Sequence, residues 1–393
     1  MSQPSSVRPF YRPMRPRRRD EPHRSATPLE LFFDLCFAVA VAQAAGGLHH
    51  DVSEGHLGHA LTRYLMVFFA IWWSWMNFTW FASAYDTDDD LYRITTLVQI
   101  AGALIIAAGV PRAFTDGDFS VITYGYVVMR IALVVQWCRA AAGDPAHRRA
   151  ARRYAIGVTV VQLGWLLRLA LPQSWGTAAL LLLVVADVLV PAVAERPGMT
   201  PWHPRHITER YGLFTLIVLG EVVLATSVVI QTGVDAGDRH LWSLAAAAAV
   251  IVFALWWLYF DRPIEAPAQL PYSLVWGYGH YLIFAAVAAV GAGLSVSVDY
   301  ERRLAHISER TAGYAVAVPI AVFLLTVWVL HVRRRQHGVV VVAYPVVALL
   351  TLLTPLGPAP VYALAASLVA LVVLTTLLRR REVDRNAATA GPA

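Results

Sequence analysis

The chain has 393 residues, of which 58% are apolar and only 15% are charged, and its net charge is +6. Its mean hydropathy is +0.53. Soluble domains carry about 25% charged residues, so this composition excludes an ordinary soluble protein and predicts one embedded in a membrane. All of the basic side chains that carry this charge are arginines, because the sequence contains no lysine.

Long apolar segments follow one another along almost the whole chain. A helix that crosses a bilayer needs about 20 predominantly apolar residues. Segments of this kind are expected over residues 29–48, 61–84, 91–110, 119–141, 152–171, 175–194, 207–230, 241–260, 272–297, 312–332, 338–354 and 359–378. The sequence therefore predicts an all-α fold, a polytopic transmembrane bundle of about 12 helices.

Arginine clusters predict the orientation of these helices. They occur before the first span, after the fourth, sixth and tenth spans, and after the last span. All of them lie on one side if the helices alternate in direction, and arginine-rich loops face the cytoplasm. We therefore expect a multi-pass protein of the plasma membrane with both termini in the cytoplasm. The basic residues 1–25 and the polar residues 381–393 are expected to be disordered tails.

The two halves of the chain resemble each other. Leu29–Gln43 and Thr208–Glu221 each have a Glu as their second residue, continue through mostly apolar residues and end on a polar one. Further matches in the same order are Trp72–Asn77 with Trp256–Asp261, Gln99 with His280, and Gly125–Tyr126 with Gly313–Tyr314. They predict two parallel six-helix repeats, residues 26–200 and 201–380, about an axis along the membrane normal. The alternative is coincidence between apolar helices of similar composition.

Charged and amide side chains recur near the cytoplasmic ends of the predicted spans. Glu30 and Asp34 lie one helical turn apart and share a helix face. Arg93 could pair with them or with the acids just before it. The whole set, the inner charged collar, comprises Glu30, Asp34, Asn77, Arg93, Glu209, Arg210 and Asp261. Such a collar is either a gate in a transport path or a set of polar contacts that hold helices together.

A second polar layer lies deeper, about 12–20 Å from the cytoplasmic side at a rise of about 1.5 Å per residue. Its members are Gln43, Gln99, Arg130, Asp187, Glu221 and His280. Arg130 and Asp187 carry opposite charges and could neutralise each other. Glu221 and His280 could form a proton-exchanging pair. Ionisable groups at this depth mark ion or substrate pathways, although buried pairs also serve as structural contacts.

Other polar motifs predict no metal site and no enzyme. The loop His49–His59 holds four histidines without a fixed ligand spacing, which favours a solvated loop over a zinc or copper site. Asp86–Asp90 lacks the glycine and glutamate of a calcium loop, so these acids are expected to cap the next helix. We find no phosphate-binding loop, nucleophile elbow or zinc-protease motif. We therefore predict no metal, no cofactor and no nucleic-acid partner.

Three stretches of the chain carry a family resemblance. Leu29–Leu35 reads Leu-Glu-Leu-Phe-Phe-Asp-Leu, Trp72–Asn77 leads to Asp86–Arg93, and His206–Thr215 leads to Leu219-Gly220-Glu221. In order and spacing they resemble the bacterial low temperature requirement protein A family, over most of the chain up to about His280. The resemblance implies an integral membrane protein of many helices and no established substrate or reaction. Val222-Val223 departs from the more polar Ser-Ile expected after Glu221.

Two functions remain open from the sequence. The first is a transporter or channel-like protein for a small solute or ion, with Glu221 and His280 as protonation-coupled groups and Glu30, Asp34, Glu209 and Arg93 as an inner gate. The second is a structural or lipid-interacting membrane protein whose acids only pack helices. Membrane lipids are partners in both cases, and the sequence does not indicate an oligomeric state.

Overall fold

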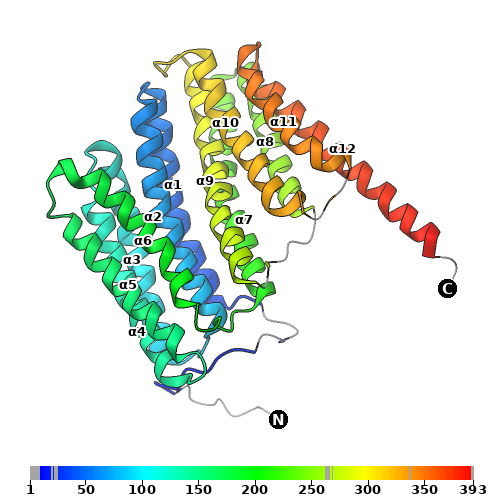
Figure 1. The fold of residues 1–393 in the computed structure, drawn as a ribbon. Coiled ribbons are helices and arrows are strands. Elements are labelled where there is room, and N and C mark those ends of the chain that lie inside the picture. The colour runs from blue at the N-terminus through cyan, green and yellow to red at the C-terminus, as the bar shows by residue number, and fades with distance from the viewer. Residues whose placement is uncertain are drawn as a thin grey trace, which may run out of the picture. The chain divides into compact units, whose positions relative to one another are not determined.

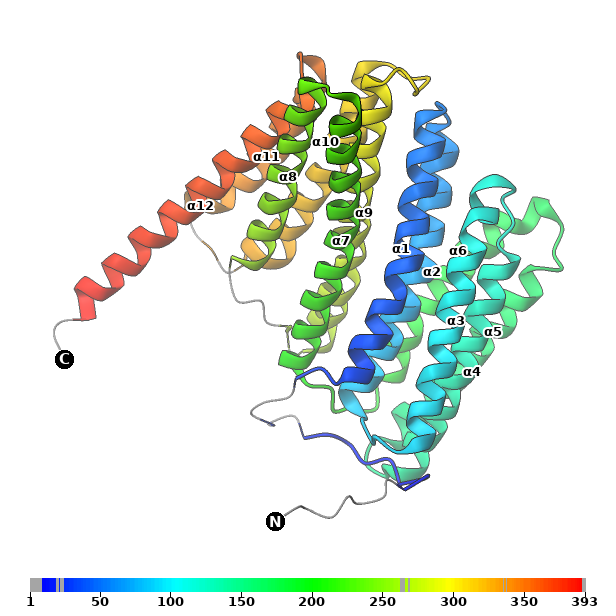
Figure 2. The same ribbon diagram turned by 180° about the vertical axis from the view of Figure 1, so that it is seen from behind.

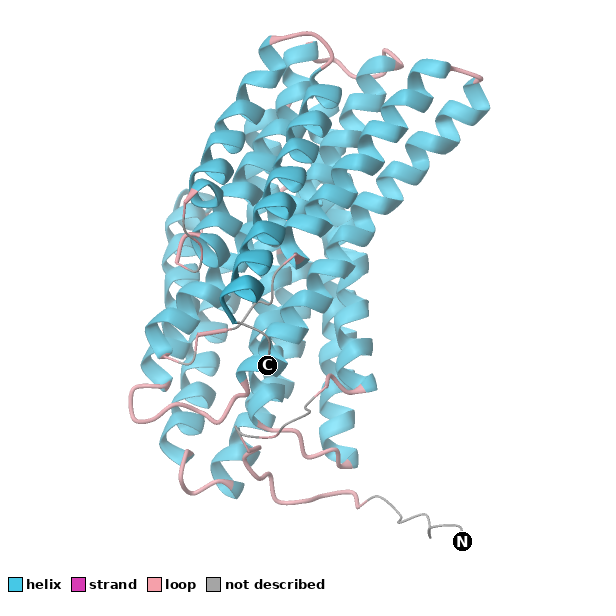
Figure 3. Ribbon diagram, turned by 90° about the vertical axis from the view of Figure 1, so that its right-hand side faces the viewer, coloured by secondary structure: helices cyan, strands magenta, loops and turns pink. Residues whose placement is uncertain are grey.

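The computed structural model describes residues 9–18, 21, 25–261, 266–267, 269–334, 336 and 338–390, excepting the side chains of 173, 236 and 382–390. All regular elements within these ranges are helices (Figure 1 and Figure 3). The twelve α-helices are α1 (Pro28–Ser53), α2 (Leu57–Ala84), α3 (Asp90–Thr115), α4 (Ser120–Gly143), α5 (Arg148–Arg168), α6 (Gln173–Ala194), α7 (Pro204–Ala236), α8 (Arg239–Phe260), α9 (Leu270–Glu301), α10 (Glu309–Val327), α11 (Val339–Leu353) and α12 (Pro360–Ala390). Each predicted span coincides with one of them, which confirms the all-α, twelve-helix fold.

Eleven helices of the described chain are long and apolar enough to cross a membrane. The helix outside this set is α5, which differs in carrying five arginines near its ends. Its middle still presents an exposed apolar stripe at helical spacing, formed by Ile156, Val160, Leu163 and Leu167. Because exposing such an apolar stripe to water costs free energy, these side chains are expected to contact lipid acyl chains.

The structure describes parts of both predicted tails. Helix α12 continues to Ala390, so the backbone of residues 381–390 is helical where disorder is expected. Residues 1–8, 19–20, 22–24 and 391–393 of these tails lie outside the described residues. Residues 9–18 follow a defined path and contact the end of α2 and the start of α3 through backbone hydrogen bonds, including one from Arg17 N to the Ala84 oxygen (3.0 Å).

The chain forms two compact units, and their boundaries pass through helices. The first unit comprises residues 1–44, 66–214 and 265–275, and the second comprises 45–65, 215–264 and 276–393. Helices α1, α2, α7 and α9 therefore contribute to both units. These boundaries do not follow the predicted repeats, and the six-plus-six duplication stays a prediction.

In the first unit, α3, α4, α5 and α6 pack against one another in chain order (Figure 1). Glycine makes the closest of these contacts possible. A Cβ atom on Gly125 of α4 would lie 2.7 Å from the Gly102 oxygen of α3, and one on Gly102 would lie 2.8 Å from the Gly125 oxygen. Small residues at helix crossings let two backbones approach and gain packing energy in lipid.

In the second unit, α10, α11 and α12 pack in chain order and α8 packs against α12 (Figure 2). Helix starts follow the expected capping chemistry. Asp238 caps α8 by accepting a hydrogen bond from His240 N (2.8 Å), and Ser308 caps α10 by accepting one from Thr311 N (3.2 Å). A π-helical turn, Trp328–Val332, continues α10.

Candidate functional site

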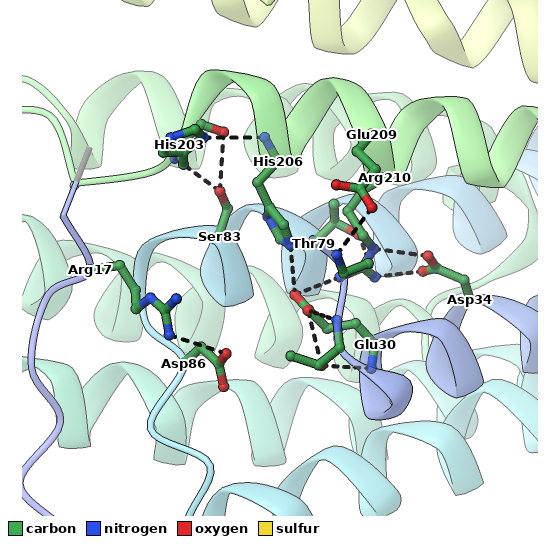
Figure 4. A network of polar contacts seen from close by, with 12 residues as sticks. Arg17, Glu30, Asp34, Thr79, Ser83, Asp86, His203, His206, Glu209 and Arg210 are labelled. Carbon is green, nitrogen blue, oxygen red and sulfur yellow. Dashed lines mark hydrogen bonds and ion pairs between the residues drawn. The ribbon is translucent and has the colours of Figure 1, made fainter. Parts of the chain in front are cut away.

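A buried guanidinium and two carboxylates form a charged site in the first unit. Glu30 and Asp34 lie one turn apart near the start of α1, and Arg210 lies near the start of α7 (Figure 4). Arg210 Nε donates to Asp34 Oδ2 at 2.8 Å, Nη2 donates to Asp34 Oδ1 at 2.5 Å, and Nη1 donates to Glu30 Oε1 at 2.9 Å. The three side chains are no more than 1% exposed.

Neighbouring polar groups hold the two carboxylates in place. The indole Nε1 of Trp75 in α2 donates to Asp34 Oδ1 at 2.7 Å. The backbone N and the hydroxyl of Thr27 donate to Glu30 Oε2 at 2.8 and 3.0 Å, which caps the start of α1. Because both carboxylates accept hydrogen bonds from groups besides Arg210, their positions do not depend on the guanidinium alone.

A histidine joins this group from the same helix as the arginine. His206 precedes Arg210 by one helical turn, and its Nε2 lies 3.2 Å from Glu30 Oε1 (Figure 4). The backbone N of His206 donates to Nδ1 of His203 at 3.3 Å, and the backbone N of His203 donates to Ser83 Oγ at 3.0 Å. We call Glu30, Asp34, His206 and Arg210 the Arg210 cluster.

The charges of the Arg210 cluster do not balance when the histidine is neutral. Two carboxylates face one guanidinium, which leaves a formal charge of −1 in a site that is at most 1% exposed. An uncompensated charge in a low-dielectric interior is costly, so such a site favours uptake of a proton or a cation. His206 is placed to carry that proton beside Glu30.

The other members of the predicted collar have separate partners. Arg93 does not reach Glu30 or Asp34; its Nε donates to Asp88 Oδ1 at 2.8 Å, the second of the two pairings that the sequence left open. Glu209 accepts from the backbone N of Ala26 at 3.1 Å. The remaining two are Asn77, which donates to the Trp73 oxygen at 2.7 Å, and Asp261, which pairs with Arg379 at 2.8 Å in the second unit.

A second buried ion pair joins α4 and α6 of the first unit. Arg130 Nη2 lies 3.7 Å from Asp187 Oδ1, so the predicted partners are neighbours. Asp187 Oδ2 accepts hydrogen bonds from the Tyr126 hydroxyl at 3.0 Å and from Trp165 Nε1 at 2.8 Å. The Arg130 guanidinium also donates to the Tyr126 hydroxyl and lies over its ring, 4.4 Å from the centroid.

A small, mostly apolar cavity of about 50 Å³ lies next to the hydrogen-bond donors of this ion pair. Tyr126 and Trp165, the two side chains that donate to Asp187, form part of its wall. Phe119, Ile122 and Arg168 contribute further wall atoms. The cavity is large enough for a water molecule or a small ion.

The remaining predicted residues of the deeper layer lie apart from one another. Gln99 Nε2 donates to Gln136 Oε1 at 3.1 Å within a buried pair between α3 and α4. Gln43 is exposed on α1. Their assignment to a pathway stays a prediction.

Glu221 and His280 both lie in the second unit, and the structure does not bring them together. No hydrogen bond or ion pair joins them within the described chain, and Glu221 is half-buried on α7. The His280 ring is fully buried among aromatic rings, with centroids of Trp276 at 4.2 Å and His331 at 5.2 Å. Its Nδ1 lies 2.7 Å from the Trp276 oxygen.

Sequence reasoning missed several contacts of these sites. His206 could have been found, because a residue four positions before a buried arginine shares its helix face. The roles of Trp75, Tyr126 and Trp165 leave no signal, since aromatic residues are common throughout these helices. Asp89 accepts from Tyr92 N at 2.7 Å, which confirms the predicted cap, but its ion pair with Arg139 at 2.5 Å was not predicted.

The fold and its buried charges define the class of the protein as a multi-pass helical membrane protein. The chain belongs to the family of bacterial low temperature requirement A proteins, whose family model matches residues 25–378. It is similar to an uncharacterized protein of Rhizobium meliloti (strain 1021), with 25% identity over 327 residues that cover 78% of this chain and 77% of the relative. The predicted family is therefore confirmed.

Proposed function

We propose that this protein transports a small solute or ion and that the Arg210 cluster is a protonation-coupled gate. The observation that carries the proposal is the ratio of two carboxylates, Glu30 and Asp34, to one guanidinium in a fully buried site. A contact that only packs helices needs one carboxylate for Arg210. The second carboxylate gives the site a formal charge that a proton or a cation has to neutralise.

A change of protonation would alter the link between α1 and α7. When His206 is charged, its charge and that of Arg210 balance the two carboxylates. Helices α1 and α7 are then held together at this site. With His206 neutral, the charge of −1 weakens this balance and favours entry of another cation. Coupling between proton occupancy and helix contact is the property that a gate of a secondary transporter requires.

The Arg130–Asp187 pair and its cavity are the proposed route deeper into the membrane. The cavity of about 50 Å³ reaches the two donors of Asp187, Tyr126 and Trp165. A passing ion or polar solute could exchange hydrogen bonds with these groups. Glu221 and His280 remain proposed as separate titratable positions of the second unit, without direct exchange between them.

Proton movement into proteoliposomes tests the proposal. A pH-sensitive dye is enclosed, a potassium diffusion potential is imposed with valinomycin, and a panel of amino acids, sugars and salts is added outside. We expect protein-dependent proton entry in at least one condition, strongly slowed by Asp34→Asn and His206→Gln. Glu309→Gln, which neutralises an exposed carboxylate at the start of α10, is the matched control.

Two results would count against transport. The first is proton entry equal to that of protein-free liposomes in every condition. The second is entry that Asp34→Asn and His206→Gln leave unchanged while both variants lower the unfolding temperature in detergent. The second result would favour the alternative, a structural membrane protein whose acids serve helix packing.

A further inference from the structure

The segment that precedes α1 is docked on the first unit by its own backbone. Arg12 N donates to Asp89 Oδ2 at 2.7 Å, and Leu91 N donates to the Phe10 oxygen at 3.2 Å. Arg17 N donates to the Ala84 oxygen at 3.0 Å. These bonds attach the segment to the end of α2, to the loop after it and to the start of α3.

Side chains fix the same segment from α4. Arg139 Nη2 donates to Asp89 Oδ2 at 2.5 Å and to the Arg12 oxygen at 3.3 Å, and its guanidinium lies 5.2 Å from the centre of the Tyr11 ring. Met14 is fully buried, and a Cβ atom on Gly143 would collide with its carbonyl oxygen. Gly143 therefore leaves the space into which Met14 inserts.

The docked segment and the α2–α3 loop form an open pocket of about 410 Å³. Its wall consists of Arg12, Pro13, Arg15, Pro16, Arg17, Asp86 and Thr87. Three arginines and one aspartate give this wall a formal charge of +2. A pocket of this size is in the range of about 300–1,000 Å³ that small-molecule sites occupy.

The positive charge of this pocket is only partly compensated. Arg17 pairs with Glu21 at 2.7 Å and lies 3.6 Å from Asp86 (Figure 4). Arg12 and Arg15 form no ion pair with any residue that the structure describes. Thr87 Oγ1 is buried and has no hydrogen-bond partner among the same residues. The pocket thus presents two exposed guanidinium groups, and the buried hydroxyl in its wall lacks a partner among the described residues.

We propose that this pocket binds a phosphate group, with Arg12 and Arg15 as its charged contacts and the Thr87 hydroxyl as a further donor. Guanidinium groups match the geometry of phosphate oxygens and form charge-assisted hydrogen bonds with them. The pocket lies at the end of the helices where α1 begins. The phosphate could therefore belong to the headgroup of a lipid or to a soluble compound, and the two sources share this chemistry.

Binding to the full-length protein in two arms tests the site. In the first arm, inorganic phosphate and pyrophosphate are titrated into the detergent-solubilised protein by calorimetry. In the second arm, the protein is placed in nanodiscs of phosphatidylcholine with and without phosphatidylglycerol, and its thermal unfolding is compared. Binding in the first arm identifies a soluble ligand class, and stabilisation confined to the second identifies a lipid headgroup. Either result supports the site if it depends on the pocket arginines.

Matched double variants decide whether the pocket is responsible. Arg12→Gln with Arg15→Gln is expected to weaken phosphate binding, or to reduce the phosphatidylglycerol effect, by about tenfold, since two charge-assisted contacts are lost. Arg149→Gln with Arg152→Gln removes the same charge from exposed positions of α5 and is expected to retain binding. Thr87→Val is expected to weaken it without a change of charge.

Equal losses in the two double variants would overturn the proposal, because they would indicate attraction to net charge alone. Wild-type protein that responds to neither phosphate nor phosphatidylglycerol would overturn it as well. The exposed positions of Arg12 and Arg15 make misfolding an inadequate explanation of a selective loss, which unchanged unfolding temperatures in detergent would verify.

Discussion

Arg210 and Asp34 form a bidentate ion pair, with Nε and Nη2 of the guanidinium donating to the two carboxylate oxygens at 2.8 and 2.5 Å. The third nitrogen, Nη1, is directed to Glu30. The planar fork of arginine therefore serves two acids from two turns of α1 at once. A lysine ammonium is a single charged point and cannot reproduce this geometry.

Removing the guanidinium is expected to destabilise the protein strongly. Arg210→Leu leaves Glu30 and Asp34 buried without a counter-charge, which costs about 3–5 kcal/mol in comparable buried pairs. Arg210→Lys should retain part of this stability. Arg93→Leu breaks the exposed pair with Asp88 and is expected to cost less than about 1 kcal/mol. Chemical unfolding in detergent measures all three, and equal effects of the two leucine variants would contradict this interpretation.

The Arg130–Asp187 pair is expected to behave non-additively. Arg130→Leu or Asp187→Leu alone strands a buried charge and should cost about 3–5 kcal/mol. The double variant removes both charges and should be clearly more stable than either single variant. A double-mutant cycle of unfolding free energies provides the measurement. Single effects that simply add would show that the two charges do not interact.

The close approach of α3 and α4 predicts contrasting effects of alanine at two glycines. Gly125→Ala places a methyl group against the Gly102 oxygen and is expected to cost about 1–3 kcal/mol through overpacking. Gly220→Ala, in α7, meets nothing within 4 Å and should be neutral or stabilising by up to about 1 kcal/mol. Unfolding temperatures in detergent compare the two, and a stable Gly125→Ala protein would refute the close contact.

Membrane orientation can be tested with fusions and labelling. We expect a C-terminal green fluorescent protein fusion to fluoresce and an alkaline phosphatase fusion to be inactive, since the arginine clusters predict cytoplasmic termini. In a chain with Cys36 and Cys138 replaced, a cysteine at Ala305 should react with an impermeant maleimide added to whole cells. An active phosphatase fusion together with an unreactive cysteine would show that the chain has the opposite orientation.

Much of the fold could be predicted because the bilayer leaves few choices for the backbone. Apolar runs of the required length identified all twelve helices, since lipid demands that backbone groups bond within each segment. The i to i+4 spacing placed Glu30 and Asp34 on one face, and the acids before α3 indicated its cap. These features could be predicted because they depend on residues that are close together in the sequence.

The remaining contacts depend on how distant helices meet. The sequence left Arg93 to pair either with Glu30 and Asp34 or with the acids just before it, because depth does not determine which helix faces which. Glu221 and His280 were predicted to pair because of their similar depth, and they do not contact each other in the structure. The docking of residues 9–18 could not be predicted either, because their composition is that of a disordered tail. Their order comes from the burial of Met14 and from contacts with Asp89 and Arg139.

The long sequence separation within the Arg210 cluster has a consequence for biogenesis. Asp34 is synthesised 176 residues before its counter-ion. At about 5–20 residues per second, the ribosome needs roughly 10–35 s to bridge this interval. During that time the two acids of α1 have no guanidinium beside them, and an unpaired buried carboxylate is costly. Both cationic side chains of the cluster, His206 and Arg210, lie on α7, so the two acids of α1 meet their counter-charges only after α7 has been made.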